Sequence, residues 1–315
     1  MIDFDERLAQ LVLSRVSGVG GATFRKLLAR CGSALDVFDA DDGALLEVAR
    51  VTAATIAELR ALHDRLPALR DELCALQDEG VELVTHAEFP RALRAAQDAP
   101  ALLYVRGRFT ADDDLAVAIV GSRDASDAGM ALAARLAAQL AEHGVTIVSG
   151  LALGIDGAAH RGALDAGGRS IGVLGSGIRR MFPPEHAELA EAMTQRGAVV
   201  SECEPNTPVN ARWLMMRDRI ISGLSLAVIV VEAATDSGTM DTAERARKQG
   251  RALFAVDWPG DSERTAGNRR LFRAGAGAVA PDGAPDIEAI LRACNDTSAR
   301  LDDPTTSEPS QGKLF

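Results

Sequence analysis

The stretch Leu115–Gly150, LAVAIVGSRDASDAGMALAARLAAQLAEHGVTIVSG, contains a complete strand–helix–strand unit. Residues 115–121 form a short apolar run, which is typical of a buried strand. Residues 127–144 have apolar side chains at helical spacing and end in a glycine, and residues 145–150 form a second apolar run. A helix between two such runs predicts two parallel strands joined by a crossover helix.

The alternation of apolar runs and helical segments continues beyond residue 150. Further strands are expected at residues 170–177, 198–202, 226–232 and 252–258, and further helices at residues 154–168, 184–197 and 239–250. Strands that are apolar throughout are buried on both faces, as in parallel sheets covered by helices. The sequence therefore predicts an α/β domain over residues 80–281, with a Rossmann-like, mostly parallel sheet and helices on both faces.

The segments on either side of this domain have different patterns. Residues 1–75 have apolar residues at helical spacing and predict a small helical domain. Within it, two helices flank the turn SGVGG (17–21), which is the order of a SAM-like or helix-hairpin-helix domain that binds the DNA backbone. A plain turn is the favoured alternative, because only Arg25 and Lys26 are basic nearby. Residues 295–315 are polar and rich in Pro, Ser and Thr, which predicts a disordered tail.

Composition restricts the class of protein. The chain has 315 residues, 47% of them hydrophobic, and a formal net charge of −11. No apolar run approaches the roughly 18 residues of a membrane span, and the acidic N-terminus lacks the layout of a signal peptide. The four cysteines have no metal-site spacing. We therefore expect a cytoplasmic protein with reduced thiols, no metal and no cofactor.

Glycines mark the ends of the predicted strands. In an open α/β sheet, ligands bind beyond the carboxyl ends of the strands, where glycine allows close approach and helix N-termini offer amides to anions. The residues predicted to form such an anion-binding edge are Gly121, Ser122, Arg123, Gly150, Gly154, Gly175 and Gly177. Ser237, Gly238 and Thr239 open a helix, so that helix capping and anion binding are equal alternatives for them. The dinucleotide pattern GxGxxG is not met, so NAD is weakly supported.

Arginines are concentrated at the same predicted edge. Residues 205–281 are net basic, with 11 Lys and Arg against 8 Asp and Glu. The arginines predicted to contact phosphates are Arg123, Arg179, Arg212, Arg217 and Arg219, and Trp213 or Phe182 would stack on bases. For any single arginine, pairing with a nearby acid is the simpler interpretation. The segment from Arg212 to Gly223 must cross the sheet as a helix, which makes Arg217 the stronger DNA candidate and Arg219 the weaker one.

Several titratable residues could instead indicate catalysis. Asp156 and His160 are one helical turn apart, and we interpret them as structural, because no third metal ligand or nucleophile has compatible spacing. The segment SGTMDTAE (237–244) resembles the helix start of nucleoside-phosphate hydrolases of the cytokinin-activating type. In such an enzyme Glu232 or Glu244 would direct water at an N-glycosidic bond, but the paired glycines of that family are missing. A sensor of nucleotide signals is a third alternative.

Longer motifs favour one family. GSRDAS, IVSGLALGIDGAAHRGAL, GVLGSGIRRMFPPEH, SECEPNTP, RDRIISGLS and SGTMDTAERARKQGRALFAV occur in this order. Together they closely resemble the DNA-processing protein A family (DprA, also called Smf), over about residues 80–280. Residues 1–75 resemble the helical N-terminal domain common in that family. The resemblance implies a homodimeric, non-enzymatic protein that binds single-stranded DNA and loads RecA recombinase onto it during natural transformation.

The chain departs from the family pattern at one motif. The usual FPxRNR is LMMRDR at residues 214–219, so that Asp218 replaces an asparagine. A carboxylate at a DNA-binding edge repels phosphate, and we expect a weaker affinity than in typical relatives. The last five residues, QGKLF, resemble the peptide that binds the bacterial sliding clamp, with Gln311, Leu314 and Phe315 as its anchors.

Overall fold

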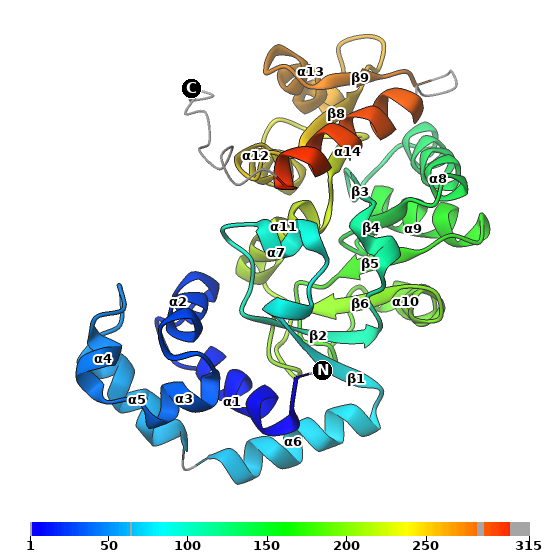
Figure 1. Ribbon diagram of the computed structural model, residues 1–315. Coiled ribbons are helices and arrows are strands. Elements are labelled where there is room, and N and C mark those ends of the chain that lie inside the picture. The colour runs from blue at the N-terminus through cyan, green and yellow to red at the C-terminus, as the bar shows by residue number, and fades with distance from the viewer. Residues whose placement is uncertain (1, 64, 282–286, 303–315) are drawn as a thin grey trace. The chain divides into compact units, whose positions relative to one another are not determined.

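The computed structural model describes residues 2–63, 65–281 and 287–302, and the chain folds as two compact units (Figure 1). The first contains residues 1–89 and 97–106, and the second contains residues 90–96 and 107–315. The antiparallel hairpin of β1 (Val81–Thr85) and β2 (Leu102–Gly107) clusters with the N-terminal helices.

The first unit has a helical core. Its helices are α1 (Phe4–Ser14), α2 (Gly21–Cys31), α3 (Ala34–Asp39), α4 (Asp42–Leu46), α5 (Ala53–His63) and α6 (Leu66–Asp78). Leu11, Leu27 and Leu73 are buried to 2% exposure or less where α1, α2 and α6 present their apolar faces. In the first half of α2, the guanidinium of Arg25 donates to the carbonyls of Gln97 and Ala99. Lys26 is exposed.

The second unit contains a parallel sheet, as predicted. Its strands are β3 (Ala116–Val120), β4 (Thr146–Ser149), β5 (Ser170–Val173), β6 (Ala198–Ser201), β7 (Ala227–Val230), β8 (Ala252–Val256) and β9 (Gly277–Val279). They lie in the order β6-β5-β4-β3-β7-β8-β9, and every pair from β5–β6 to β8–β9 is parallel. β3 to β7 are fully buried, which explains their unbroken apolar sequences.

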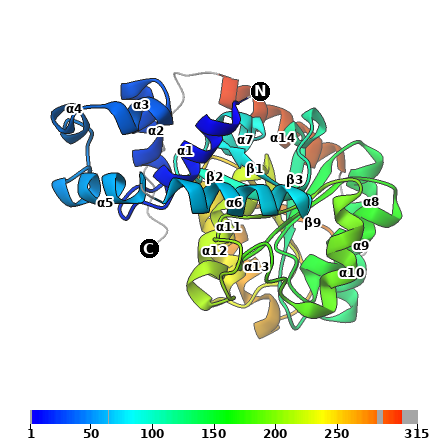
Figure 2. The same ribbon diagram turned by 90° about the horizontal axis from the view of Figure 1, so that it is seen from below.

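Helices cover both faces of this sheet (Figures 1 and 2). The longer ones are α8 (Asp127–Glu142), α9 (Ile155–Asp165), α11 (Ala211–Leu224), α12 (Gly238–Lys248) and α14 (Ile287–Asp302), and the shorter ones are α7 (Arg91–Ala95), α10 (Ala187–Thr194) and α13 (Ala266–Arg273). In both views α8, α9 and α10 lie together on one side of the sheet, and α11 and α12 lie on the other.

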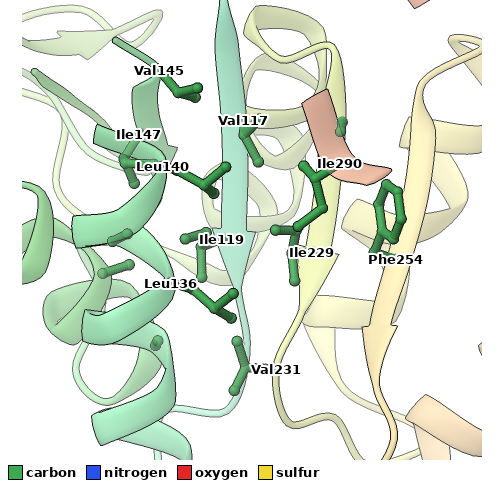
Figure 3. Packing of buried hydrophobic residues seen from close by; sticks show 14 of the residues in the cluster. Val117, Ile119, Leu136, Leu140, Val145, Ile147, Ile229, Val231, Phe254 and Ile290 are labelled. Atoms are coloured by element: carbon green, nitrogen blue, oxygen red, sulfur yellow. The ribbon is translucent and has the colours of Figure 1, made fainter. Parts of the chain in front are cut away.

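One face of the sheet carries the main hydrophobic core (Figure 3). Leu136 and Leu140 of α8 pack against Val117 and Ile119 of β3, and Ile290 of α14 lies beside β7 and β8. Alternate strand residues point to the opposite face, where α11 contacts β3, β4 and β5.

The C-terminal part of the chain differs from expectation. Residues 295–302 were predicted to be disordered, but they form the end of α14. Ile290, Cys294 and Thr297 are one turn apart and buried against the sheet, so packing stabilises a segment whose composition is polar. Residues 303–315, with the proposed clamp-binding residues, lie outside the described part. Among the described helices, none has both the length and the apolar character needed to cross a bilayer.

Replacing Leu136 tests the core. Leu136→Ala removes a fully buried side chain, and we expect the free energy of unfolding to fall by about 3 kcal/mol. Arg135→Ala, an exposed neighbour on the same helix, should change it by less than about 0.5 kcal/mol. Denaturant titration of both variants measures the difference, and equal effects would contradict the assignment of this face of α8.

Candidate nucleic-acid interface

The connection of the strands creates a crevice at the carboxyl edge of the sheet. From β3 the chain moves outward through β4, β5 and β6, and α11 then carries it back to β7 on the other side of β3. Such a change of direction is where open α/β sheets bind ligands. The segment from Arg212 to Gly223 is helical, as the sequence predicted.

Two adjoining clefts lie at this crevice. The first, called the main cleft, has a volume of ≈ 330 Å³ and lies between the loop after β3 and the start of α12. Its lining includes Gly121, Ser122, Arg123, Asp156, Leu214, Arg217, Asp218, Ser237, Gly238 and Thr239. The second, called the apolar cleft, has a volume of ≈ 100 Å³ and is lined by residues including Gly150, Leu153, Gly175, Phe182 and Leu214. Arg123 and Arg217 line both clefts.

Arg217 is buried at the centre of the edge. Only 7% of it is exposed, and its Nη1 donates to the carbonyls of Gly150 and Val173, the latter at 2.8 Å. Its guanidinium also lies 3.9 Å from Asp156 and 3.6 Å from Asp218. These contacts fix α11 to the ends of β4 and β5. A phosphate contact by Arg217 stays a prediction, and its positive charge acts from inside the protein.

Polar side chains form hydrogen bonds with the backbone of the loop after β4. The carboxylate of Asp156 accepts from the amides of Gly150, at 3.1 Å, and Ala152, at 3.3 Å. Nε2 of His160 accepts from the amide of Leu151 at 3.3 Å, while Nδ1 of His186 donates to the carbonyl of Leu151 at 2.9 Å. Leu151 has a φ of 56°, a conformation that is energetically unfavourable for any residue other than glycine. These bonds maintain that conformation.

Burial keeps His160 neutral. Desolvation, with smaller effects of His186 and Arg217, lowers the pKa of His160 to about 3. Its Nδ1 lies 2.7 Å from the hydroxyl of Ser170, which itself donates to the carbonyl of Ile147. Asp156 and His160 thus bind the loop backbone separately, which fits a structural role for each. The described residues include no cluster of three or more His, Cys, Asp or Glu side chains that would hold a metal ion.

Most glycines at the edge are packed against protein atoms. A Cβ on Gly150 would lie 1.7 Å from the Arg217 guanidinium, and one on Gly175 would lie 2.7 Å from Leu214. Gly177 and Gly121 are similarly close to Pro205 and Ile155. Close packing inside the protein therefore already requires glycine at these positions, whether or not a ligand approaches them. Gly238 differs, because no atom lies within 4 Å of the position of its missing Cβ.

The start of α12 is open to the main cleft. Ser237 makes no capping bond to this helix, since its hydroxyl donates to the carbonyl of Ala234 at 2.9 Å. Of the two alternatives left by the sequence, capping is therefore not observed. The first amides of a helix have no partner within it, and those of α12 face a cleft that also contains Arg123.

The predicted arginines fall into distinct environments. Arg123 is exposed and makes no ion pair within the described part of the chain. Arg219 forms an ion pair with Glu202 and lines neither cleft. Arg212 lies 5.8 Å from the centre of the Trp213 ring, and both are outside the clefts, as are Arg179, Gly154 and Gly177. The structure therefore brings Arg123 and Arg217 together, but not Arg219.

Asp218 lines the main cleft next to Arg217. Its side chain is 9% exposed. Burial raises the pKa of Asp218 to about 7, and Asp241 and Asp156 act in the same direction, against Arg217 and Arg245. The repulsion expected from an aspartate at this position is thus reduced, because a fraction of the carboxyl is protonated near neutral pH.

Comparison with known proteins agrees with this architecture. A model of the family described as DNA recombination-mediator protein A matches residues 81–291, and a model of the DprA-like N-terminal HHH domain matches residues 4–41. The chain belongs to the DNA recombination-mediator protein A family. The resemblance noted in the sequence motifs is thereby confirmed.

Two named relatives match part of this chain. Protein Smf of Escherichia coli is 43% identical over 189 residues, which cover 60% of this chain and 50% of that protein. DNA processing protein DprA of Bacillus subtilis is 36% identical over 197 residues, covering 62% and 66%. The matched region thus spans only about half to two thirds of the length of these relatives.

Solved DprA structures share the fold. The X-ray structure of DNA processing protein A from Streptococcus pneumoniae has a TM-score of 0.76 at 28% identity, and the match covers 93% of this chain and 98% of that one. DNA processing protein A from Helicobacter pylori has a TM-score of 0.58 at 28% identity, covering 68% and 96%. That structure is described as showing a single-stranded DNA binding mode of the H. pylori protein.

One buried side chain that the sequence did not single out lies at the ends of β7 and β8. Asn268 of α13 is 1% exposed, and its amide donates to the carbonyls of Val231, at 2.9 Å, and Val256, at 3.0 Å, while its oxygen accepts from the amide of Ala233. It therefore joins the ends of β7 and β8.

Replacing Asp218 tests its protonation. A carboxyl whose pKa rises on folding, from about 4 to about 7, stabilises the protein below the lower value and loses that contribution as pH rises toward the higher one. Asp218→Asn should therefore become more stable relative to the unmodified chain between these two pH values, with a constant difference above them. Denaturant titration across this range measures the effect. A difference that does not vary with pH would contradict the raised pKa.

Proposed function

We propose that this protein binds single-stranded DNA along the two clefts and acts as a recombination mediator that loads RecA recombinase during natural transformation. The observation that carries the DNA-binding proposal is the main cleft, whose lining contains the exposed Arg123 and the start of α12, a helix with no side-chain cap. Family membership and the described H. pylori structure support the same assignment.

Phosphate is the chemical group that this combination suits. Arg123 supplies an exposed guanidinium, and the amides that open α12 supply donors that are not used inside the helix. Gly238 leaves the approach to these amides free of side-chain atoms. The buried charge of Arg217 adds attraction without requiring its bonds to the carbonyls of Gly150 and Val173 to break.

The apolar cleft supplies a place for bases. Phe182 is 42% exposed and lines this cleft with Leu153 and Leu214. Stacking of a base on an aromatic ring contributes about 1–3 kcal/mol and does not depend on the base. Phe182 is a better candidate than Trp213, because the face of Trp213 is near the Arg212 guanidinium and away from both clefts.

The contacts of the two candidate catalytic acids favour binding over hydrolysis. Glu232 is 2% exposed and accepts from the backbone amide of Ser126, at 3.0 Å, and from the Ser126 hydroxyl. It therefore anchors the start of α8. Glu244 pairs with Lys248 at 2.6 Å and does not line either cleft. Neither carboxylate is positioned to direct water at a ligand in the main cleft.

The partners are proposals that follow from the family. We propose a homodimer in the cytoplasm that presents single-stranded DNA to RecA, with the sliding clamp as a further partner of the tail ending in Leu314 and Phe315. The mediator proposal is tested by RecA filament formation on DNA already coated with single-strand-binding protein. We expect this chain to accelerate filament formation, and no acceleration would contradict the mediator proposal.

Replacing Arg123 tests the phosphate contact. Arg123→Ala should weaken binding to a thymine-only oligonucleotide by about tenfold, because a hydrogen bond to a charged group is lost. The slope of log affinity against log salt should fall by about 0.7, as expected for one phosphate contact on a single strand. Fluorescence anisotropy at several salt concentrations measures both quantities.

Arg135→Ala is the matched control for this experiment. It removes the same formal charge from the exposed face of α8, away from the lining of both clefts. Its affinity should stay within about twofold of the unmodified chain. Equal losses in the two variants would show that net charge, and not the main cleft, determines binding.

A further inference from the structure

The main cleft contains a buried acceptor that phosphate binding does not explain. Asp218 lines the cleft, and within the described ranges no hydrogen-bond donor reaches its carboxyl group. Its single ionic neighbour is Nε of Arg217, at 3.6 Å, and that Nε itself lacks a hydrogen-bond partner. A carboxyl group that is nine-tenths buried and has unfilled acceptor positions requires a donor from a ligand or solvent.

Neighbouring carboxylates are already occupied. Asp156, from α9, accepts from the loop amides of Gly150 and Ala152. Asp241, from α12, pairs with Arg245 at 2.6 Å. These groups and Arg217 are the charged neighbours that affect Asp218. Asp124 also lines the main cleft, but it is 97% exposed and lies 3.4 Å from Arg264. Among the described residues of the lining, Asp218 is therefore the buried acidic group whose acceptors remain available to the main cleft.

The lining of the main cleft contains groups of opposite chemistry. Arg123 and the amides of α12 attract an anion at one part of the lining, whereas a carboxylate repels phosphate oxygens. The part of a DNA strand that faces Asp218 must therefore donate hydrogen bonds. Phosphates and internal deoxyribose groups have no donors, so this part is a base.

Among the bases, guanine matches a carboxylate best. Its N1–H and N2–H lie side by side on the Watson–Crick edge and can bind both oxygens of one carboxylate. Thymine has one N–H between two carbonyl oxygens, and these oxygens would be repelled. The apolar side chains of Leu214, Met215 and Ile221 line the same cleft and would contact the ring. The volume of ≈ 330 Å³ is at the low end for small-molecule sites and suits a single nucleotide.

We infer that the main cleft is a guanine-preferring nucleotide subsite, in which Asp218 binds the base and Arg123 binds the phosphate. This inference rests on the proposed single-stranded DNA binding and adds base preference to it. An asparagine at this position would offer a donor as well as an acceptor. The preference for guanine is thus a property of the aspartate in this chain.

The protonation of Asp218 also predicts that the preference for guanine depends on pH. Guanine needs the ionised carboxylate, while a phosphate or a thymine is repelled by it. Because burial raises the pKa of Asp218 to about 7, the preference for guanine should increase as pH rises through that value. Binding of guanine then releases a proton, and a thymine-only strand should bind more weakly over the same rise in pH.

The experiment compares three oligonucleotides of equal length by fluorescence anisotropy. One contains only thymine, one has isolated guanines spaced by thymines, and one has inosine in place of each guanine. At a pH above the pKa of Asp218, we expect the guanine strand to bind about tenfold more tightly than the thymine strand. Inosine lacks the N2 amino group and should lose most of this advantage.

Asp218→Asn separates this inference from the proposed function. The substitution keeps the size of the side chain and should abolish both the guanine preference and its dependence on pH, while thymine-only binding becomes tighter. Equal affinity of the unmodified chain for all three strands, or a preference that persists in Asp218→Asn, would overturn the guanine subsite. In both of those cases the protein still binds DNA, whereas failure to bind any strand would instead overturn the proposed function.

A free guanine nucleotide has the same base and phosphate groups as a guanine in a DNA strand and could occupy the main cleft in its place. Guanosine monophosphate should compete with the guanine strand only weakly, because it lacks the neighbouring phosphates and bases. Competition as strong as that of the oligonucleotide would overturn the assignment to a DNA strand.

Discussion

The buried guanidinium of Arg217 is the contact on which the binding edge depends. It joins the returning helix α11 to carbonyls at the ends of β4 and β5, close to the point where the chain changes direction. The cost of burying its charge is offset by two carbonyl dipoles and by nearby carboxylates. By fixing α11, it also places Leu214 and Asp218 in the clefts.

Some polar side chains at this edge of the sheet are bonded within the protein, and others remain available to a ligand. Asp156, His160 and His186 are used by the loop after β4, and Glu232 is used by the start of α8. What remains is a small set with opposite preferences: a cationic and amide-rich part, and an acceptor-rich part. A ligand of one charge throughout does not satisfy both, whereas a nucleotide does.

The sheet could be predicted from sequence because its strands are short, wholly apolar and separated by helices that end in glycine. The predicted disorder of residues 295–302 was wrong, because contacts between distant parts of the chain decide the structure there. The β1–β2 hairpin clusters with the N-terminal helices, and residues 295–302 are helical because α14 covers the sheet. The edge of the site was also predictable, but the use of each arginine was not. Glu202 pairs with Arg219 from 17 residues away, and Arg123 has no such neighbour in the described chain.

The glycine-rich loops have a consequence for tracing this fold among distant proteins. Gly150, Gly175 and Gly177 are required by the protein's own atoms, which occupy the space where a side chain would begin. A descendant that no longer bound any ligand would still need these glycines to fold. The glycine signature therefore reports ancestry and architecture. The identity of the ligand is recorded instead at the few open positions, such as Gly238 and the residue that occupies position 218.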